Sequence, residues 1–294
     1  MNEFIGLRRG ISALSPHRCE WAALGAETCA ALQLVCGGAA RAVQHVGSTS
    51  VAHIPAKPIL DITVGAESLD DAEELIPALE AIGAKFRRRS ETDNELLFVM
   101  EAQPEIVTHH IHVVPFESME WRNYQYFRDY LNAHPDKAQE YGTLKTALAR
   151  QFPRDRKAYT GGKADLIRSI LRKAQVWFFL GKTVTATIDR PVGTAHPKHP
   201  DMIYPINYGY IAGEIAPDGE GLDVYVLGED APCAFVTGQI IAVVHRADDV
   251  EDKLVMLAQG ACPARAITAA EIADAIAFQE RYYQSRVEVL AVRY

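Results

Sequence analysis

The chain has 294 residues, of which 48% are hydrophobic and 23% charged, a composition typical of a globular protein with one large domain or two medium ones. Its net charge of −8 is uneven, because residues 1–180 carry 21 basic against 22 acidic side chains and residues 181–294 carry 9 against 16, or −1 and −7. The acidic second half argues against a nucleic-acid groove there, since phosphate backbones attract Lys and Arg, but it does not exclude a phosphate substrate that arrives with metal ions.

The cysteine content and the N-terminus bear on where the protein works. The five cysteines are odd in number and include no C-x-x-C pair, a pattern that favours a reducing cytoplasm over a disulfide framework. The first residues, MNEFIGLRRG, lack the apolar core of a signal peptide, and no apolar run approaches transmembrane length. We therefore expect a cytoplasmic protein without a membrane partner, and the sequence is compatible with a homo-oligomer.

The first half mixes strand and helix patterns. Ser15-Pro16, a cap residue followed by Pro at the first helical position, starts a helix that Gly37-Gly38 ends. Ser68 with Asp71 starts another helix to about residue 82, which Pro77 should kink or shorten. The other expected elements are strands at 42–46, 59–64, 96–100 and 110–114 and helices at 118–132, 135–150 and 157–179. The pattern predicts an α+β domain with its strands together and a helical layer behind them.

Several motifs of this half occur together in one known family. HVGSTSV at residues 45–51 precedes AKPILDI at 56–62, and THHIHVV follows at 108–114. These motifs and their order resemble the GrpB family of nucleotidyltransferase-like proteins over roughly residues 14–176. The chain departs from the family pattern at Val51-Ala52-His53, where the family has Val-Pro-Gly.

The resemblance implies a nucleotide-phosphate site. A small Gly-Ser turn lets backbone N–H groups and a hydroxyl approach a triphosphate, and carboxylates on neighbouring strands hold metal ions. Such enzymes place two acids one residue apart, whereas here Asp61 is followed by Thr63. The substrate-binding residues implied for this half are Gly47, Ser48, Lys57, Asp61, His45, His110 and His112.

The histidines of this set allow more than one interpretation. His110 and His112 share a strand face where a third acid is expected. Either these imidazoles help to hold a softer metal than Mg²⁺, or the transferase chemistry is weakened or lost. The alternative for all three histidines, His45 included, is a buried side chain that only makes hydrogen bonds. On the later helices, Arg128 and Lys145 are candidates to face the same cleft.

A change of pattern marks a second domain. The predicted helix runs into the apolar segment VWFFL at 176–180, and short strands and turns follow, so we place the domains at 1–180 and 181–294. Strands are expected at 184–188, 224–227, 239–245 and 254–257, with a loop at 193–201. Thr268 and Glu271 form a capping box that starts a final helix. This order predicts a small OB-like β-barrel with a C-terminal helix packed on it.

Carboxylates are concentrated in the second domain. Seven of them fall in two groups, at residues 218–223 and 248–252, where they would repel one another unless a cation neutralised them. Mg²⁺ binds such oxygen ligands together with water and substrate phosphates. The seven are Asp218, Glu220, Asp223, Asp248, Asp249, Glu251 and Asp252.

The acids lie within motifs of a second family. YPINYGYI at 204–211, DGEGLD at 218–223, DDVEDK at 248–253 and FQERYY at 278–283 are similar to motifs of the barrel-type soluble inorganic pyrophosphatases. The resemblance implies Mg²⁺, with Mn²⁺ as an alternative, held by Asp218, Asp223, Asp248 and Asp252. The residues that it implies for catalysis and substrate positioning are Asp218, Glu220, Asp223, Tyr208, Lys253 and Tyr282.

The departures from that family leave the substrate open. Gly221 replaces a Pro, Tyr283 replaces a Lys, and the usual basic segment is not recognisable, although Asp189 offers a substitute for an N-terminal Glu. We expect hydrolysis of inorganic pyrophosphate, or of a nucleotide diphosphate bond, beside a nucleotidyltransferase-like domain whose transfer would release pyrophosphate. The alternatives are a transferase with a structural pyrophosphatase-like half and a nucleotide- or metal-binding protein with two decayed sites.

Overall fold

The computed structural model describes residues 4–90, 94–216, 219–261 and 265–290. It divides into two compact units, Met1–Leu171 and Arg172–Tyr294. The division falls within helix α7 (Ala164–Phe179), upstream of the predicted boundary at Gly181. The reason is packing, since Val176 and Phe179 belong to the hydrophobic core of the second unit.

The first unit is built on a six-stranded sheet with the order β2-β3-β6-β5-β4, to which the short β1 adds beside β6. Only the β3–β6 contact within that order is parallel. The strand order therefore places β3 and β6, the two strands that carry the predicted site residues, next to each other. The strands are β1 (Leu7–Arg8), β2 (Ala40–Val46), β3 (Leu60–Ala66), β4 (Lys85–Ser90), β5 (Glu95–Gln103) and β6 (Ile106–Pro115).

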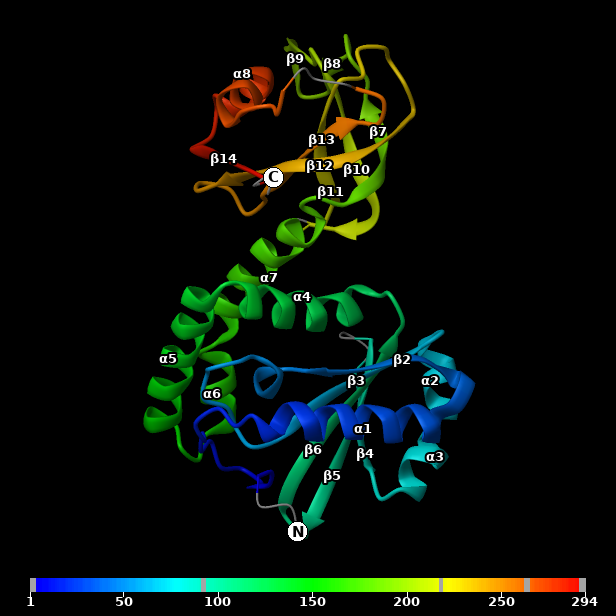
Figure 1. Cartoon of the computed structure of the whole chain (residues 1–294), viewed down its shortest axis with the longest axis vertical. Coiled ribbons are helices and arrows are strands. Elements are labelled where there is room, and N and C mark those ends of the chain that lie inside the picture. The colour runs from blue at the N-terminus through cyan, green and yellow to red at the C-terminus, as the bar shows by residue number, and fades with distance from the viewer. Residues whose placement is uncertain (1–3, 91–93, 217–218, 262–264, 291–294) are drawn as a thin grey trace. The chain divides into compact units, whose positions relative to one another are not determined.

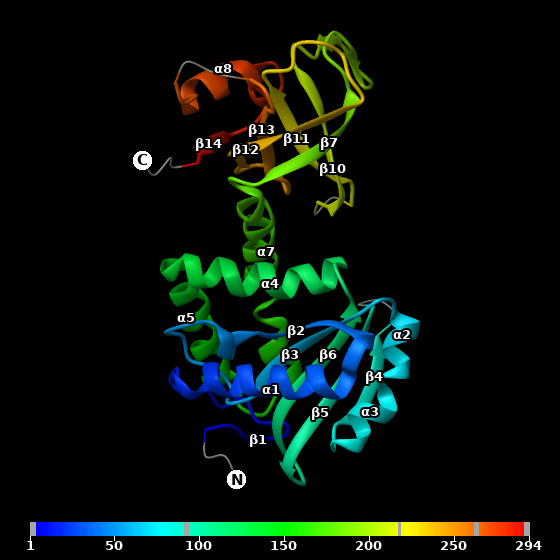
Figure 2. The same ribbon diagram turned by 45° about the vertical axis from the view of Figure 1, so that its right-hand side comes forward.

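Helices cover the two faces of this sheet differently (Figures 1 and 2). One face packs against α1 (Glu20–Cys36), α2 (Leu69–Glu74) and α3 (Ile76–Ala81), which bury Trp21 and Leu32 in one core with the strands. The other face carries the site, which α4 (Met119–Ala133), α5 (Pro135–Gln151), α6 (Arg156–Gly161) and the start of α7 surround. The α+β architecture predicted for this half is confirmed.

Local differences from the sequence prediction have local causes. Ser68 caps α2 through the backbone N–H of Asp71, as predicted, and Pro77 sits in the first turn of a separate helix, α3. Gly161 and Gly162 divide the single helix predicted at 157–179 into α6 and α7. The strand β4 was not predicted, because its arginine-rich sequence lacks a clear apolar alternation.

The prediction that no segment approaches transmembrane length needs a correction. By length and composition alone, residues 20–39 are long and apolar enough to cross a membrane. The core helix of a globular protein passes the same test, and here Trp21 and Leu32 on this helix lie in the core of the first unit. This finding is weak support for a membrane span.

The second unit is a closed β-barrel. Its strands follow the order β13-β11-β10-β7-β12, and β12 also pairs with β13, so that these five strands close on themselves with β14 added outside β12. The bounds are β7 (Thr183–Arg190), β10 (Asn207–Ile215), β11 (Gly221–Leu227), β12 (Phe235–Arg246), β13 (Lys253–Ala258) and β14 (Ser285–Val289). Helix α8 (Ala269–Glu280) packs Ile272 and Ile276 against the outward side chains of the barrel. The barrel with a C-terminal helix is confirmed.

The second unit also contains elements that the sequence did not reveal. The segment predicted as a loop at 193–201 overlaps a two-stranded ladder of β8 (Ala195–His196) and β9 (His199–Ile203). β10 covers the second half of the YPINYGYI motif, and β14 begins at Ser285, after α8 has ended at Glu280. The capping box of Thr268 and Glu271 is present and starts α8, which ends at Glu280.

Gly209 is needed where two barrel strands approach closely. A Cβ atom on this residue would lie 1.9 Å from the carbonyl oxygen of Thr187 in β7, at the point where the β10–β7 register shifts. A backbone atom in a ladder cannot move aside cheaply, so we expect Gly209→Ala to destabilise the barrel by roughly 2–3 kcal/mol. Calorimetry of the full chain measures this as a lower unfolding temperature of the second unit. Gly38→Ala, whose Cβ meets nothing within 4 Å, is the control. Equal shifts for both variants would contradict the steric explanation.

Candidate functional site

Asp61, His110 and His112 converge on one face of the first sheet. The parallel register pairs Asp61 with His110 and Thr63 with His112, so alternation places all four on the same face. Nδ1 of His110 lies 3.0 Å from Oδ1 of Asp61, and Nε2 of His112 lies 3.7 Å from the same oxygen. One ligand atom from each of the three lies within 4.8 Å of the others. The three therefore form a candidate metal site.

A fourth residue, which the sequence analysis missed, holds His112 in place. Glu95 at the start of β5 is buried, and its Oε2 lies 3.2 Å from Nδ1 of His112. The hydroxyl of Tyr124 in α4 donates to Glu95 at 2.8 Å and lies 3.0 Å from the same His112 nitrogen. The available signal was a Glu directly before an apolar strand, which places a carboxylate at the end of the sheet where β5 begins.

The charges of this cluster reinforce one another. Burial alone would raise the pKa of Asp61, but hydrogen bonds with His110 and His112 hold it well below its usual value. Burial would likewise lower the pKa of His112, yet its bonds with Asp61 and Glu95 raise that pKa to about 9. Without another cation, His112 is thus charged at neutral pH and balances the two carboxylates.

The Gly47-Ser48 turn lies against Asp61, as the sequence predicts. Gly47 has φ of 69°, and a Cβ there would lie 2.4 Å from Oδ2 of Asp61. Only glycine fits this position without displacing the carboxylate. Ser48 is hydrogen-bonded to Tyr141, and both Ser48 and Asp61 line the two cavities that meet here.

One of these cavities is cationic. It encloses about 200 Å³, and its basic side chains next to Asp61 include Lys57, Lys145, Arg156 and Lys163. Lys145 is buried and donates to the carbonyl oxygen of Pro55 at 2.9 Å. Burial, followed by the charges of Lys163 and Arg156, lowers the pKa of Lys57 to about 8. Burial also lowers the pKa of Lys145 and of Lys163. Such a cluster of like charges favours an anion.

The second cavity is larger and partly aromatic. It encloses about 540 Å³ and shares Asp61, Ser48 and Lys163 with the cationic cavity. Tyr124, Phe127 and Tyr141 supply aromatic surface to it, together with the apolar side chains of Ile167 and Leu171. An apolar chamber beside a cationic one suits a ligand that has a ring system and a phosphate chain.

His45 does not join this site. Its strand neighbour in register is Ile62, which faces the core under α1, so His45 points away from the face that carries Asp61. Its Nε2 lies 2.9 Å from Oγ1 of Thr49, and its ring fills the space over Gly25 of α1. His45 is therefore a partly buried, hydrogen-bonded histidine on the face of the sheet that α1 covers.

In the second unit, Asp223 and Lys253 lie side by side on parallel strands. The register pairs Val224 with Leu254, which sets the two preceding side chains on the same outward face. Nζ of Lys253 donates to Asp223, to Oε2 of Glu251 at 2.9 Å and to the hydroxyl of Tyr208 at 2.9 Å. Two carboxylates therefore share one ammonium group in a largely buried cluster.

Tyr208 acts as a donor in this cluster. Burial first, and then the charge of Asp223, raises the pKa of Tyr208 well above its ordinary value. The hydroxyl therefore stays protonated and donates to Asp223. Asp189 lies close enough that burial and the charge of Asp223 help to raise its pKa, against the effect of Arg190. Asp189 is the residue that the family resemblance offers in place of an N-terminal Glu.

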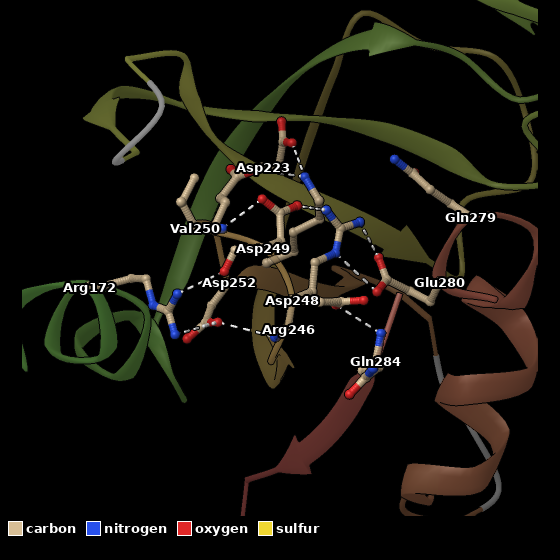
Figure 3. Close-up of polar contacts among 12 residues, drawn as sticks. Arg172, Asp223, Arg246, Asp248, Asp249, Val250, Asp252, Gln279, Glu280 and Gln284 are labelled. Atoms are coloured by element: carbon tan, nitrogen blue, oxygen red, sulfur yellow. Dashed lines mark hydrogen bonds and ion pairs between the residues drawn. The ribbon is translucent and has the colours of Figure 1, made fainter. Parts of the chain in front are cut away.

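The other predicted acids belong to a different network (Figure 3). Asp252 is 1% exposed and accepts from the backbone N–H of Arg246, while its other oxygen lies 3.0 Å from Nδ1 of His245. Asp248 accepts from the backbone N–H of Gln284. Asp252 and Asp223 therefore lie in separate clusters, because Glu251, one residue earlier, shares the outward face with Lys253.

The remaining predicted residues of this half are Asp218, Glu220 and Tyr282. Asp218 lies outside the residues that the structure describes. Glu220 is exposed directly before β11. Tyr282 is 64% exposed beyond the end of α8, and its ring lies 5.4 Å from the guanidinium carbon of Arg281.

Comparisons with known proteins agree with the two folds. Residues 12–173 match the family described as GrpB protein, and residues 184–283 match the inorganic pyrophosphatase family. The crystal structure of the conserved protein GrpB from Enterococcus faecalis is similar with a TM-score of 0.52 and 28% identity, covering 56% of this chain and 99% of that one.

Curated relatives match the first half. A UPF0157 protein of Pseudomonas aeruginosa is 40% identical over 134 residues, 45% of this chain, and the match spans only 54% of that protein. The glutamate-rich protein GrpB of Alkalihalophilus pseudofirmus is 34% identical over 172 residues, 58% of this chain and 99% of its own length. The chain belongs to the GrpB family through its first domain and carries an inorganic pyrophosphatase domain as its second.

Proposed function

We propose that the second domain hydrolyses inorganic diphosphate with the help of a divalent cation, Mg²⁺ or Mn²⁺. The observation that carries this proposal is the convergence of Asp223 and Glu251 on Lys253 in a domain of the inorganic pyrophosphatase family. Carboxylate oxygens are the donors that Mg²⁺ prefers. When bound, such an ion lowers the pKa of a coordinated water toward neutrality and so supplies a nucleophile.

The residues of the chain have separate roles in this proposal. Asp223 and Glu251 would hold the cation, and Lys253 would pair with a phosphate oxygen of the substrate. Tyr208, protonated as described, holds Asp223 in position by donating to it. Arg190, on β7 beside Asp189, offers a further cation for a phosphate group.

A phosphate-release assay on the full chain tests the proposal. We expect Mg²⁺- or Mn²⁺-dependent release from inorganic diphosphate that chelation abolishes and that Asp223→Asn lowers at least ~10²-fold. Nucleoside diphosphates and triphosphates are run in parallel to test the alternative substrate. No phosphate release from inorganic diphosphate with either metal would overturn the proposal.

A second candidate function belongs to the first domain. The cationic cavity and the aromatic cavity meet at Asp61, which favours a nucleoside triphosphate as ligand and nucleotidyl transfer as the reaction. Transfer would release diphosphate, which the second domain would remove. A labelled nucleoside triphosphate that yields labelled product with the wild type but not with Asp61→Asn would support the transfer, whereas binding without turnover favours a nucleotide-binding module.

The lowered pKa of Lys57 gives this candidate a pH signature. Burial lowers the pKa of Lys57 most, and the positive charges of Lys163 and Arg156 lower it further. The negative charge of Asp61 acts in the opposite direction. A bound anion favours the charged lysine, so affinity should be highest below about pH 8 and fall by up to about tenfold per unit above it. Calorimetric titration of a nucleoside triphosphate between about pH 7 and pH 9 measures the decline. In Lys57→Arg it should vanish, because Arg stays charged. The same decline in that variant would assign it to another group.

A further inference from the structure

The geometry points to a binding site for a divalent transition-metal ion, of the Zn²⁺ type, formed by Asp61, His110 and His112 with Glu95 as a positioning residue. This inference goes beyond the hydrolysis proposed for the second domain and does not rest on it. It also does not require a nucleotide, because its probe is the metal ion alone.

The three side chains provide a ligand set that fits such an ion. Zn²⁺ accepts imidazole nitrogens and carboxylate oxygens at about 2.0–2.2 Å, which in a tetrahedral shell puts neighbouring ligand atoms roughly 3.3–3.6 Å apart. Oδ1 of Asp61 lies 3.0 Å from Nδ1 of His110 and 3.7 Å from Nε2 of His112. Mg²⁺ is disfavoured here, since it prefers an all-oxygen shell while two of the three donors are nitrogens.

Glu95 determines which nitrogen of His112 faces the ion. Its Oε2 lies 3.2 Å from Nδ1 of His112, so that Nδ1–H donates to the carboxylate and Nε2 keeps its lone pair toward Asp61 when the ring is neutral. A metal-bound histidine held at its other nitrogen by a buried carboxylate is the usual arrangement in zinc sites. Tyr124, which donates to Glu95 at 2.8 Å, fixes the carboxylate in turn.

The site also has an accessible side. Asp61 and His110 line the cationic cavity, and Asp61 and His112 line the aromatic cavity. With three protein ligands, an ion there keeps positions for water or for a ligand oxygen, as catalytic rather than structural zinc sites do. Phosphate oxygens held by Lys57 and Lys163 are the class of ligand that would reach it.

Titration of the metal-free full chain with ZnCl₂, followed by calorimetry and elemental analysis, tests the inference. We expect an ion whose affinity falls at least ~100-fold in Asp61→Asn and His112→Gln, and about 10–100-fold in Glu95→Gln. His109→Gln is the matched control. This histidine lies on the same strand but on the opposite face, where its Nε2 lies 3.4 Å from Oγ1 of Thr28 in α1, and its loss should leave the affinity unchanged. MgCl₂ should not compete at this site.

A measurement on the wild-type protein avoids the risk that a variant binds less zinc only because it is misfolded. In NMR spectra of ¹⁵N-histidine-labelled protein, Zn²⁺ should shift the signals of Nδ1 of His110 and Nε2 of His112. The signals of His109 should not change. Zinc affinity that is equal in all four variants and the wild type would overturn the site, and so would zinc shifts confined to other histidines. Failure here leaves diphosphate hydrolysis by the second domain unaffected, because that assay reads a different ion and different residues.

Discussion

Replacement of Glu251 by Gln is expected to lower diphosphate hydrolysis at least ~10²-fold while the second unit remains folded. Oε2 of Glu251 and the carboxylate of Asp223 both accept from Nζ of Lys253, so the two acids converge from neighbouring strands. Gln keeps the size and one acceptor but removes the charge that would hold a divalent cation. The measurement is kcat for inorganic diphosphate at saturating Mg²⁺, with circular dichroism as the check on folding.

The neighbouring Asp252 provides the control, because the family motif implies Asp252 as a metal ligand whereas the structure favours Glu251. Asp252 is 1% exposed, and its partners are the backbone N–H of Arg246, the ring of His245 and the guanidinium of Arg172, whose Nη2 lies 3.8 Å from Oδ1. Asp252→Asn is therefore expected to lower stability by roughly 1–3 kcal/mol, through weakened hydrogen bonds, with hydrolysis per folded molecule retained. The opposite outcome, in which Asp252→Asn loses activity and Glu251→Gln keeps it, would restore Asp252 as the metal ligand implied by the family motif.

Sequence patterns were most informative for elements that are determined by the spacing of apolar residues or by helix-capping residues. The apolar strands around Asp61 and His110 and the caps at Ser68 and Thr268 are read from residues within a few positions of one another. β14 escaped because it pairs with β12, a strand far away in the chain. β4 pairs with the next strand, β5, but its own residues are too polar to show alternation. Long-range pairing of this kind leaves little trace in a local pattern.

The residues of the candidate sites likewise fall into those that local patterns predict and those that depend on strand register. The convergence of Asp61 with His110 and His112 was foreseen, since strand alternation and family motifs place them on one face. The role of Glu95 was not, because it depends on the antiparallel register of β5 against β6. The choice between Glu251 and Asp252 depends on where β13 begins, and a shift of one residue reverses the face of every side chain.

The ion pairs that attach α8 to the barrel predict the largest effect on stability. Arg246 of β12 is 3% exposed and binds both carboxylate oxygens of Glu280, the last residue of α8, and Oδ2 of Asp249 at 2.8 Å (Figure 3). The ring of Tyr283 lies 3.6 Å from its guanidinium carbon. Arg246→Met would leave the buried Glu280 without this cation, and removal of one partner of a buried pair costs about 3–5 kcal/mol.

Calorimetry of the full chain should therefore show the transition of the second unit about 10–20 °C lower in Arg246→Met, with the first unit unchanged. Arg265→Met is the matched control, because Arg265 forms an ion pair with Glu271 at the other end of the same helix but is exposed. Solvent screens that pair, so its loss should leave the transition within the scatter of the wild type. The double variant Arg246→Met/Glu280→Met should recover much of the stability, since no buried charge is then left unpaired. Equal, small shifts for both arginine variants would show that Arg246 contributes no more than a surface charge and that apolar packing by Ile272 and Ile276 alone holds α8 on the barrel.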